Sequence, residues 1–233
     1  MSSIFIGFDP RETAAYAVAR ESIRRHITQP IPVHGLVLDQ LREQGLYWRP
    51  TERRLGRLYD VISEHEMATE FAISRFLVPH LAQFGWALFM DCDMLLRSNI
   101  ARVFEGLDKS KAVYCVKHDH RPYLQSKMDG QLQSIYPRKN WSSFMIFNCD
   151  HGANKKLTPE LVNTLPGRDL HRFCWLEDSE IGELSVEWNW LVGSDAECEP
   201  KNVHFTEGAP CFEAFRNVPY AEEWRATLSR WAA

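Results

Sequence analysis

The N-terminal half of the chain alternates short apolar runs with segments whose apolar residues recur at helical spacing. Residues 3–9, SIFIGFD, combine β-branched and aromatic side chains and end before Pro10, which predicts a buried strand followed by a loop. Residues 11–26 are rich in alanine with helical spacing, which predicts a helix. The same pattern predicts strands over 31–38, 86–93 and 111–118, and helices over 66–85 and 99–107.

In the C-terminal half the predicted elements are shorter and the loops are longer. We expect a strand over 142–150, a short helix over 178–186, an extended segment over 202–208 and a terminal helix over 220–233. Strands that alternate with helices favour an α/β fold with a mostly parallel central sheet and flanking helices. No repeat or linker separates the halves, so we expect a single domain over residues 1–233.

Composition and charge narrow the classes of function. The chain has 233 residues, and its net charge of -4 gives no electrostatic reason to expect nucleic-acid binding. Six cysteines are spread without a Cys-x-x-Cys pair, so neither a zinc site nor a disulfide framework is indicated. No apolar run is long enough for a transmembrane segment and no signal peptide is evident. We therefore expect a cytoplasmic protein. Its aromatic C-terminal segment is expected to be a packed helix, with contact to a membrane surface as the alternative.

The stretch GWALFMDCDMLLRSNI places two aspartates, Asp91 and Asp93, at the end of a predicted buried strand. Ligands of open α/β sheets bind at the carboxyl ends of strands, and paired carboxylates there repel each other unless a cation joins them. Mg²⁺ or Mn²⁺ suits such oxygen ligands, and His204 in VHFTEGAP is a candidate third ligand that suits Mn²⁺ better. Alternatively, the aspartates end the strand in a solvated turn. Cys92 between them is expected to be buried.

Blocks of the sequence occur in the order found in a known enzyme family. The segment ATEFAISRFLVPHLAQFGWALFMDCDMLLRSNIARVFE resembles the central block of GT-A fold glycosyltransferases, with an arginine, an apolar strand, a D-x-D and a short helix. Further blocks resemble that family in the same order: IFIGFDPRETAAYAVARESI, NWSSFMIFNCD, LEDSEIGELSVEWNWLVG and VHFTEGAP. The group that the chain resembles is the retaining family eight, which includes glycogenin and bacterial lipopolysaccharide sugar transferases.

The resemblance implies a Rossmann-like nucleotide-diphospho-sugar transferase of the GT-A fold. Its activity would be the metal-dependent transfer of a sugar from a nucleotide-diphosphate donor, with a UDP-sugar as the expected donor, and with retention of the anomeric configuration. The expected cofactor is Mn²⁺ or Mg²⁺. The acceptor stays open among a glycan, a lipid-linked sugar and a small molecule.

The resemblance also implies roles for individual residues, carried over by their place in the matching blocks. Arg75 would orient the carboxylates or approach the diphosphate. The implied metal ligands are Asp91, Asp93 and His204. The implied nucleotide-binding residues are Phe8, Asp9, Arg11 and Arg75. The implied contacts to the donor or acceptor sugar are Ser143, Trp188, Asn189 and Gly208, and the implied catalytic residue is Asp178.

The chain departs from the family pattern at three places. The stretch Trp141-Ser142-Ser143-Phe144 stands where the family has asparagine, serine and glycine. No lysine follows the last glycine in HFTEGAPCF, and Lys201, Lys139 and Arg216 remain open as replacements. Asp178 is followed by Ser179 where the family has glutamine. These changes keep two alternatives open, namely a nucleotide-sugar-binding protein with reduced or lost catalysis and a related nucleotidyltransferase.

Two reaction routes also stay open. The acceptor hydroxyl would attack on the face that the diphosphate leaves, or a carboxylate would first form a covalent intermediate. Asp178 and Glu180 are the sequence candidates for that carboxylate. His118 and His120 are expected in a surface loop bordering the acceptor cleft, with metal binding as the alternative.

Overall fold

A six-stranded sheet forms the centre of the computed structural model, which describes residues 2–54, 56–118, 138 and 140–232. Five of its strands run in one direction, and β9 runs antiparallel to both of its neighbours, β6 and β8. The expected α/β fold with a mostly parallel sheet is therefore confirmed. The strand order within the described residues is β10 (Ile181–Glu183), β8 (Val113–Cys115), β9 (Phe144–Asn148), β6 (Trp86–Met90), β1 (Ser2–Gly7) and β2 (Val33–Leu36).

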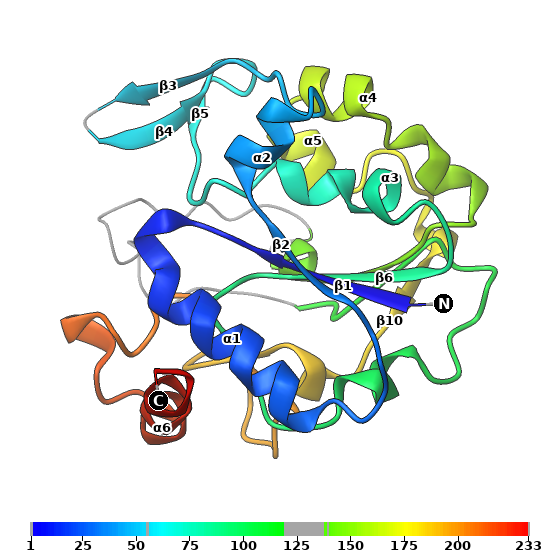
Figure 1. Cartoon of the computed structure of the whole chain (residues 1–233). Coiled ribbons are helices and arrows are strands. Elements are labelled where there is room, and N and C mark those ends of the chain that lie inside the picture. Colours follow the sequence, from blue (N-terminus) through cyan, green and yellow to red (C-terminus); the bar gives the residue numbers. More distant parts are fainter. Residues whose placement is uncertain (1, 55, 119–137, 139, 233) are drawn as a thin grey trace.

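Helices cover both faces of this sheet (Figure 1). On one face lies α1 (Thr13–His26), the helix predicted over 11–26, with the terminal helix α6 (Ala221–Trp231) packed against it. Among the described residues, no helix has both the length and the apolar character needed to cross a bilayer. The opposite face carries α2 (Leu38–Glu43), α3 (Val78–Ala82), α4 (Pro159–Thr164) and α5 (Gly167–His171).

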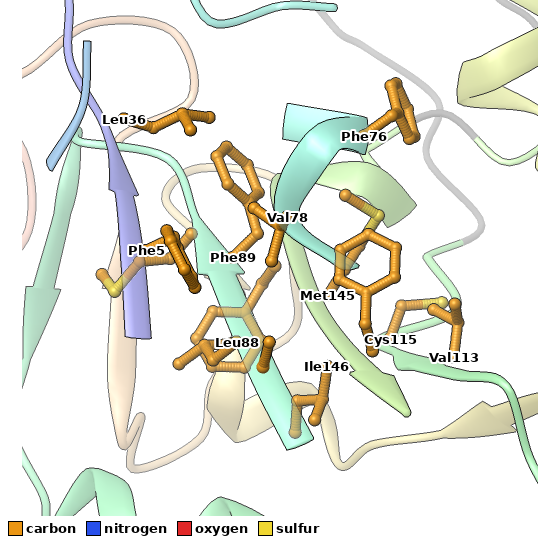
Figure 2. Packing of buried hydrophobic residues seen from close by; sticks show 14 of the residues in the cluster. Phe5, Leu36, Phe76, Val78, Leu88, Phe89, Val113, Cys115, Met145 and Ile146 are labelled. Atoms are coloured by element: carbon orange, nitrogen blue, oxygen red, sulfur yellow. The ribbon is translucent and has the colours of Figure 1, made fainter. Parts of the chain in front are cut away.

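The core lies between the sheet and these helices (Figure 2). All five residues of β9 and the last four of β6 are buried. A central strand that is covered on both faces is almost entirely apolar, which is why β6 and the first four residues of β9 read as continuous apolar runs in the sequence. Figure 2 shows Leu88 and Phe89 of β6 packed among side chains of β1, β9 and the segment that carries Phe76 and Val78.

Two smaller sheets extend this core. One pairs β12 (Asn202–His204) antiparallel with β7 (Met94–Leu96) and parallel with β11 (Trp190–Leu191). The other is a protruding antiparallel sheet of β3 (Thr51–Arg54), β4 (Arg57–Asp60) and β5 (His65–Glu66). The pattern of apolar residues did not predict β3, because its sequence TERR is polar throughout and carries no alternation.

Four predicted elements need correction. The helix predicted over 99–107 is a 3₁₀ turn over Ile100–Phe104. The helix predicted over 66–85 is wrong for most of its length, because a strand, turns and a 3₁₀ turn precede the five-residue α3. Pro79 lies in the first turn of α3, where no backbone N–H bond is lost, so it begins that helix instead of kinking a longer one. The strand predicted over 86–93 ends at Met90. The helix predicted over 178–186 is a 3₁₀ turn followed by the edge strand β10.

A buried ion pair fastens the protruding sheet to the body of the protein. The guanidinium of Arg49 donates two hydrogen bonds of 2.6 Å to the carboxylate of Asp60, and both side chains are at most 1% exposed. Arg49 also donates to the carbonyl oxygens of Val162 and Leu165, at the end of α4. Burial raises the pKa of Asp60, but the hydrogen bonds from Arg49 and Ser63 outweigh it and hold the pKa below its usual range.

Replacement of Arg49 is expected to be strongly destabilising. Arg49→Ala leaves the Asp60 carboxylate buried without its cation, which should lower the free energy of unfolding by about 3–5 kcal/mol in urea denaturation. The matched control is Arg54→Ala, since Arg54 forms an exposed pair with Glu52. That variant should lose much less stability than Arg49→Ala, because an exposed pair is screened by solvent. Equal losses in the two variants would contradict this account.

Candidate functional site

The turn that carries the paired aspartates lies between two sheets. It leaves β6 after Met90 and enters β7 at Met94. On one side, the backbone N–H of Asp91 donates to the carbonyl oxygen of Ser143 at 2.9 Å, just before β9. On the other side, the N–H of Phe205 donates to the carbonyl oxygen of Asp93 at 2.9 Å, just after β12. The turn therefore has a fixed backbone at the carboxyl end of a central strand.

The structure brings His204 to this turn from more than a hundred residues away. Antiparallel pairing of β12 with β7 sets His204 opposite Met94, the neighbour of Asp93. The Nε2 atom of His204 lies 3.3 Å from Oδ1 of Asp93. One ligand atom from each of Asp91, Asp93 and His204 lies within 4.8 Å of the others. These three residues form a compact group of metal-ligating side chains.

A chain of hydrogen bonds fixes the orientation of the imidazole. Nδ1 of His204 lies 2.9 Å from Oδ1 of Asn189, whose amide nitrogen donates to Oγ of Ser143 at 2.9 Å. Since the amide oxygen only accepts, we assign the ring proton to Nδ1, and the lone pair of Nε2 then faces the carboxylates. Two carboxylates and an imidazole lone pair are acceptors only. Such a set fits a divalent cation, and a hydrogen bond to the distal ring nitrogen is the usual support of a histidine ligand.

Arg75 is buried and contacts Asp91, another member of this group. It is 5% exposed, and its Nη1 atom lies 2.8 Å from Oδ1 of Asp91. The same nitrogen donates to the carbonyl oxygen of Ser142, and the guanidinium lies 4.8 Å from the ring centre of Phe89. Of the two roles that the resemblance implied for Arg75, this burial favours orientation of a carboxylate over contact with a diphosphate.

The loop after β1 contains the three residues that the resemblance implied for the nucleobase. Asp9 is fully buried and accepts from the backbone N–H of Arg11, twice from its guanidinium, and from the N–H of Glu70. Burial raises the pKa of Asp9, but these hydrogen bonds outweigh it and lower the pKa overall. The ring of Phe8 meets Tyr16 edge to face at 5.1 Å. Asp9 thus shapes the loop, and Phe8 and Arg11 lie beside it.

Asp178 is not brought together with the aspartate pair. It lies before β10, whose first residue pairs with Val113 at the start of β8, so it stands at the opposite end of the parallel strands from Asp91. Its side chain is 91% exposed and pairs with Arg138. The sequence suggested Asp178 because of its place in a block that resembles the family. The position of β10 at the edge of the sheet depends on the order of the strands, which the block does not show.

The remaining predicted sugar contacts are buried. Trp188 is 7% exposed, and Asn189 is fully buried in the hydrogen-bond chain to His204. Gly208 allows a close approach, because a Cβ atom there would lie 2.3 Å from a ring carbon of Phe215. Ser143 lies at the start of β9 and contacts both Asp91 and Asn189. Of these four residues, Ser143 and Asn189 therefore contact the metal-ligating group directly.

Of the residues considered as replacements for the family lysine, the structure describes Lys201 and Arg216, and each has an acidic partner. Lys201 stands at the end of β12 away from His204 and pairs with Glu187 at 2.6 Å. Arg216 is exposed and lies 4.0 Å from Glu213. Lys139 and His120 lie outside the described residues. His118 is buried beside Asp195, so the surface-loop position expected for it is wrong.

Glu12 is a residue of the site that the sequence did not suggest. It is 4% exposed, and the buried Cys92 thiol donates to its Oε2 atom at 3.5 Å. Burial, together with the nearby charges of Asp93 and Asp9, raises the pKa of Glu12 to about 8. In the sequence it looks like a solvated charge in DPRET, and only the packing of α1 against the aspartate turn reveals its burial.

Comparison with solved structures identifies the class of fold. The galactosyltransferase LgtC, solved with donor and acceptor sugar analogues, superposes with a TM-score of 0.61 at 12% identity over 99% of this chain and 96% of the other. The glycosyltransferase GlyE of Streptococcus pneumoniae gives 0.58 at 14% identity, over 99% of this chain and 62% of the other. The bifunctional glycosyltransferase WbbM gives 0.56 at 14% identity, and the chain spans about half, 51%, of its length. The chain thus has the GT-A fold of glycosyltransferases, as the sequence blocks implied.

A closer relative defines the family. Protein CDI of Arabidopsis thaliana is 45% identical over 228 residues, which cover 95% of this chain and 83% of the relative. The chain belongs to the family of Protein CDI. No protein-family model matches the sequence.

The support of His204 by Asn189 leads to a test of metal affinity. Asn189→Ala removes the partner of Nδ1 and should weaken Mn²⁺ binding about 10–100-fold, as outer-shell changes do. Calorimetric titration with Mn²⁺ measures this. Asn163→Ala is the matched control, because Asn163 is also buried and hydrogen-bonded, to Leu46 and Trp48. That control should lose stability while it keeps its Mn²⁺ affinity. A similar Mn²⁺ affinity in both variants would refute the assigned role of Asn189.

The raised pKa of Glu12 predicts a pH dependence of stability. The folded protein keeps a proton on Glu12 that the unfolded chain has lost between about pH 5 and pH 8, so stability should fall as pH rises through this window. Urea denaturation in EDTA should show this decline in the wild type, with a slope of up to about 1.4 kcal/mol per pH unit from this group. Glu12→Gln should flatten the curve. Parallel curves for the two proteins would rule out the protonated carboxyl.

Proposed function

We propose that this protein transfers a sugar from a nucleoside-diphosphate donor to an acceptor hydroxyl, with a divalent cation as cofactor. The observation that carries the proposal is the group of Asp91, Asp93 and His204, which offers only acceptor atoms at the carboxyl end of β6 in a GT-A fold. We favour catalysis over a nucleotide-sugar-binding protein without it, because the fold is that of glycosyltransferases. We infer that the whole chain acts as one domain, and we retain the expected cytoplasmic location as part of the proposal.

The residues of the proposed site have two roles, which are to bind the cation and to position its ligands. Asp91, Asp93 and His204 would hold the cation, for which Mn²⁺ is our choice because an imidazole nitrogen is among the ligands. When bound, such a cation neutralises the charge that develops on a departing diphosphate. Arg75 and Asn189 hold Asp91 and His204 in place through the contacts already described. A fixed ligand set lowers the cost of ordering the site when the donor binds.

The direction of the donor follows from the order of the strands. A diphosphate at the end of β6 can extend its nucleoside toward β1 and its sugar toward β9, or the reverse. The loop after β1 offers the aromatic ring of Phe8 and the guanidinium of Arg11, which suit a flat base. We therefore place the nucleoside at β1 and the sugar near Ser143, at the start of β9.

We propose retention by attack on the face that the diphosphate leaves. Asp178, at the far end of the strands, is paired with Arg138, and the side chain of Glu180 accepts from the backbone N–H of Glu177. Neither sequence candidate for a covalent intermediate is therefore at the aspartate turn. In the same-face route the acceptor oxygen bonds to the anomeric carbon, the sugar–phosphate bond breaks, and the hydroxyl proton passes to the departing diphosphate.

A thermal-shift experiment tests the donor site with a matched pair of aspartate variants. The wild type should be stabilised by UDP or GDP together with Mn²⁺, by about 5 °C at saturating ligand, and much less by nucleotide alone. Asp93→Asn should abolish the Mn²⁺-dependent part, because a neutral amide replaces a charged ligand. Asp178→Asn should retain the shift. A metal-dependent shift that persists in Asp93→Asn would refute the metal site, and absence of any shift in the wild type would refute the donor site.

A further inference from the structure

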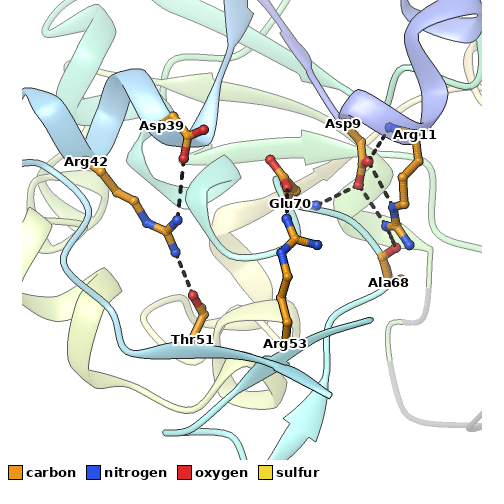
Figure 3. A network of polar contacts seen from close by, with 8 residues as sticks. All are labelled: Asp9, Arg11, Asp39, Arg42, Thr51, Arg53, Ala68 and Glu70. Atoms are coloured by element: carbon orange, nitrogen blue, oxygen red, sulfur yellow. Dashed lines mark hydrogen bonds and ion pairs between the residues drawn. The ribbon is translucent and has the colours of Figure 1, made fainter. Parts of the chain in front are cut away.

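Charged side chains from four segments meet at the carboxyl ends of β1 and β2 (Figure 3). Asp9 and Arg11 follow β1, the pair of Asp39 and Arg42 lies on α2 directly after β2, and Glu70 lies in the loop beside them. Arg53 reaches this loop from the protruding strand β3. The network therefore borders the part of the fold where the proposed function places the nucleobase.

The carboxylate of Asp9 has no capacity left for a base. A carboxylate offers about four lone-pair positions. In Asp9, Oδ1 accepts from the backbone N–H and Nε of Arg11, and Oδ2 accepts from Nη2 of Arg11 and from the backbone N–H of Glu70. Asp9 is also fully buried. It is therefore a positioning residue that fixes the backbone of Glu70 and the side chain of Arg11.

In this network, Glu70 is the carboxylate with remaining capacity to accept hydrogen bonds from a ligand. Within the described residues its side chain accepts one hydrogen bond, from Nη2 of Arg53 at 3.3 Å, and it is 13% exposed. Burial and the neighbouring charges of Asp9 and Asp39 raise the pKa of Glu70, against the opposite effect of Arg53 and Arg11. Its neighbours thus compensate its charge only in part, and N–H donors from a ligand would stabilise it.

Arg53 and Glu70 share one hydrogen bond of 3.3 Å. A guanidinium beside a carboxylate can offer a ligand the order donor, acceptor, acceptor. Guanine presents the complementary order on one edge, with the O6 acceptor, the N1–H donor and the 2-amino donor. Uracil presents acceptor, donor, acceptor, so one of its carbonyl oxygens would face a carboxylate oxygen. Adenine and cytosine place a ring nitrogen acceptor where guanine has N1–H.

We propose that Glu70 and Arg53 select a guanine base, so that the donor is a guanosine-diphosphate sugar. This inference rests on the proposed function and refines it, and it departs from the uridine base that the family resemblance implied. Glu70 accepts from N1–H and the 2-amino group, and Arg53 donates to O6. Phe8 and Arg11 line the same loop.

Calorimetric titration with nucleoside diphosphates in the presence of Mn²⁺ tests the inference. GDP should bind at least about tenfold more tightly than UDP, because a carbonyl oxygen of uracil would face the Glu70 carboxylate where guanine offers an N–H donor. Inosine diphosphate keeps N1–H and O6 but lacks the 2-amino group, so it should bind about tenfold more weakly than GDP. UDP binding as tight as GDP binding would overturn the inference while leaving the donor site intact.

Variants separate base selection from the rest of the site. Glu70→Gln should reduce GDP affinity about tenfold or more and leave UDP affinity within about twofold, so the preference collapses. The matched control is Glu66→Gln, because Glu66 also pairs with an arginine, Arg57, on the protruding sheet. The control should keep the preference for GDP. Loss of GDP and UDP binding to the same extent in Glu70→Gln would show a structural role and overturn the inference. A wild type that binds no nucleotide with Mn²⁺ would refute the proposed function itself.

Discussion

Two backbone hydrogen bonds that clamp the aspartate turn are the constraint on which the site depends. One joins Asp91 to Ser143 beside the central sheet, and the other joins Asp93 to Phe205 beside the smaller sheet of β7, β11 and β12. Carboxylates that repel each other would otherwise move apart, since the repulsion is relieved by a small rotation of the turn. With the backbone held at both ends, the charges must be neutralised by other means. Arg75 pairs with Asp91, and the acceptor atoms of Asp91, Asp93 and His204 together suit a divalent cation.

The antiparallel strand β9 links this clamp to the rest of the site. Because β9 runs against its neighbours, its first residue lies at the carboxyl end of β6, and the residues before it reach the same edge. Ser143 thereby contacts Asp91 through its carbonyl group and Asn189 through its hydroxyl group. In an all-parallel sheet this position would be the end of a strand, and the support of His204 would have to come from another segment. One reversed strand thus couples the two sheets at the site.

The charged residues near the site differ in whether their hydrogen-bonding capacity is already used within the protein. Asp9 and Arg75 are charged residues of the expected site, yet each is buried and used by the protein itself. Burying a charge is favourable only when its partners are complete, and complete partners leave no capacity for substrate. Glu70 has one side-chain hydrogen bond among the described residues, so its carboxylate retains capacity for ligand donors. The proposed selection of the base follows from that difference.

The sequence by itself determined the central strands, because strands covered on both faces are almost entirely apolar, and β6 and the first four residues of β9 show such runs. It also indicated that Asp91, Asp93 and His204 belong to one site, through the order of blocks shared with a family. Only the tertiary structure decided which charges are buried. The burial of Glu12 and Arg49 has no local signal, because partners of these residues, at Cys92 and at the end of α4, are distant in the sequence. It also decided that Asp178 lies apart from the turn, because the lateral order of strands depends on pairing energies that no local pattern records.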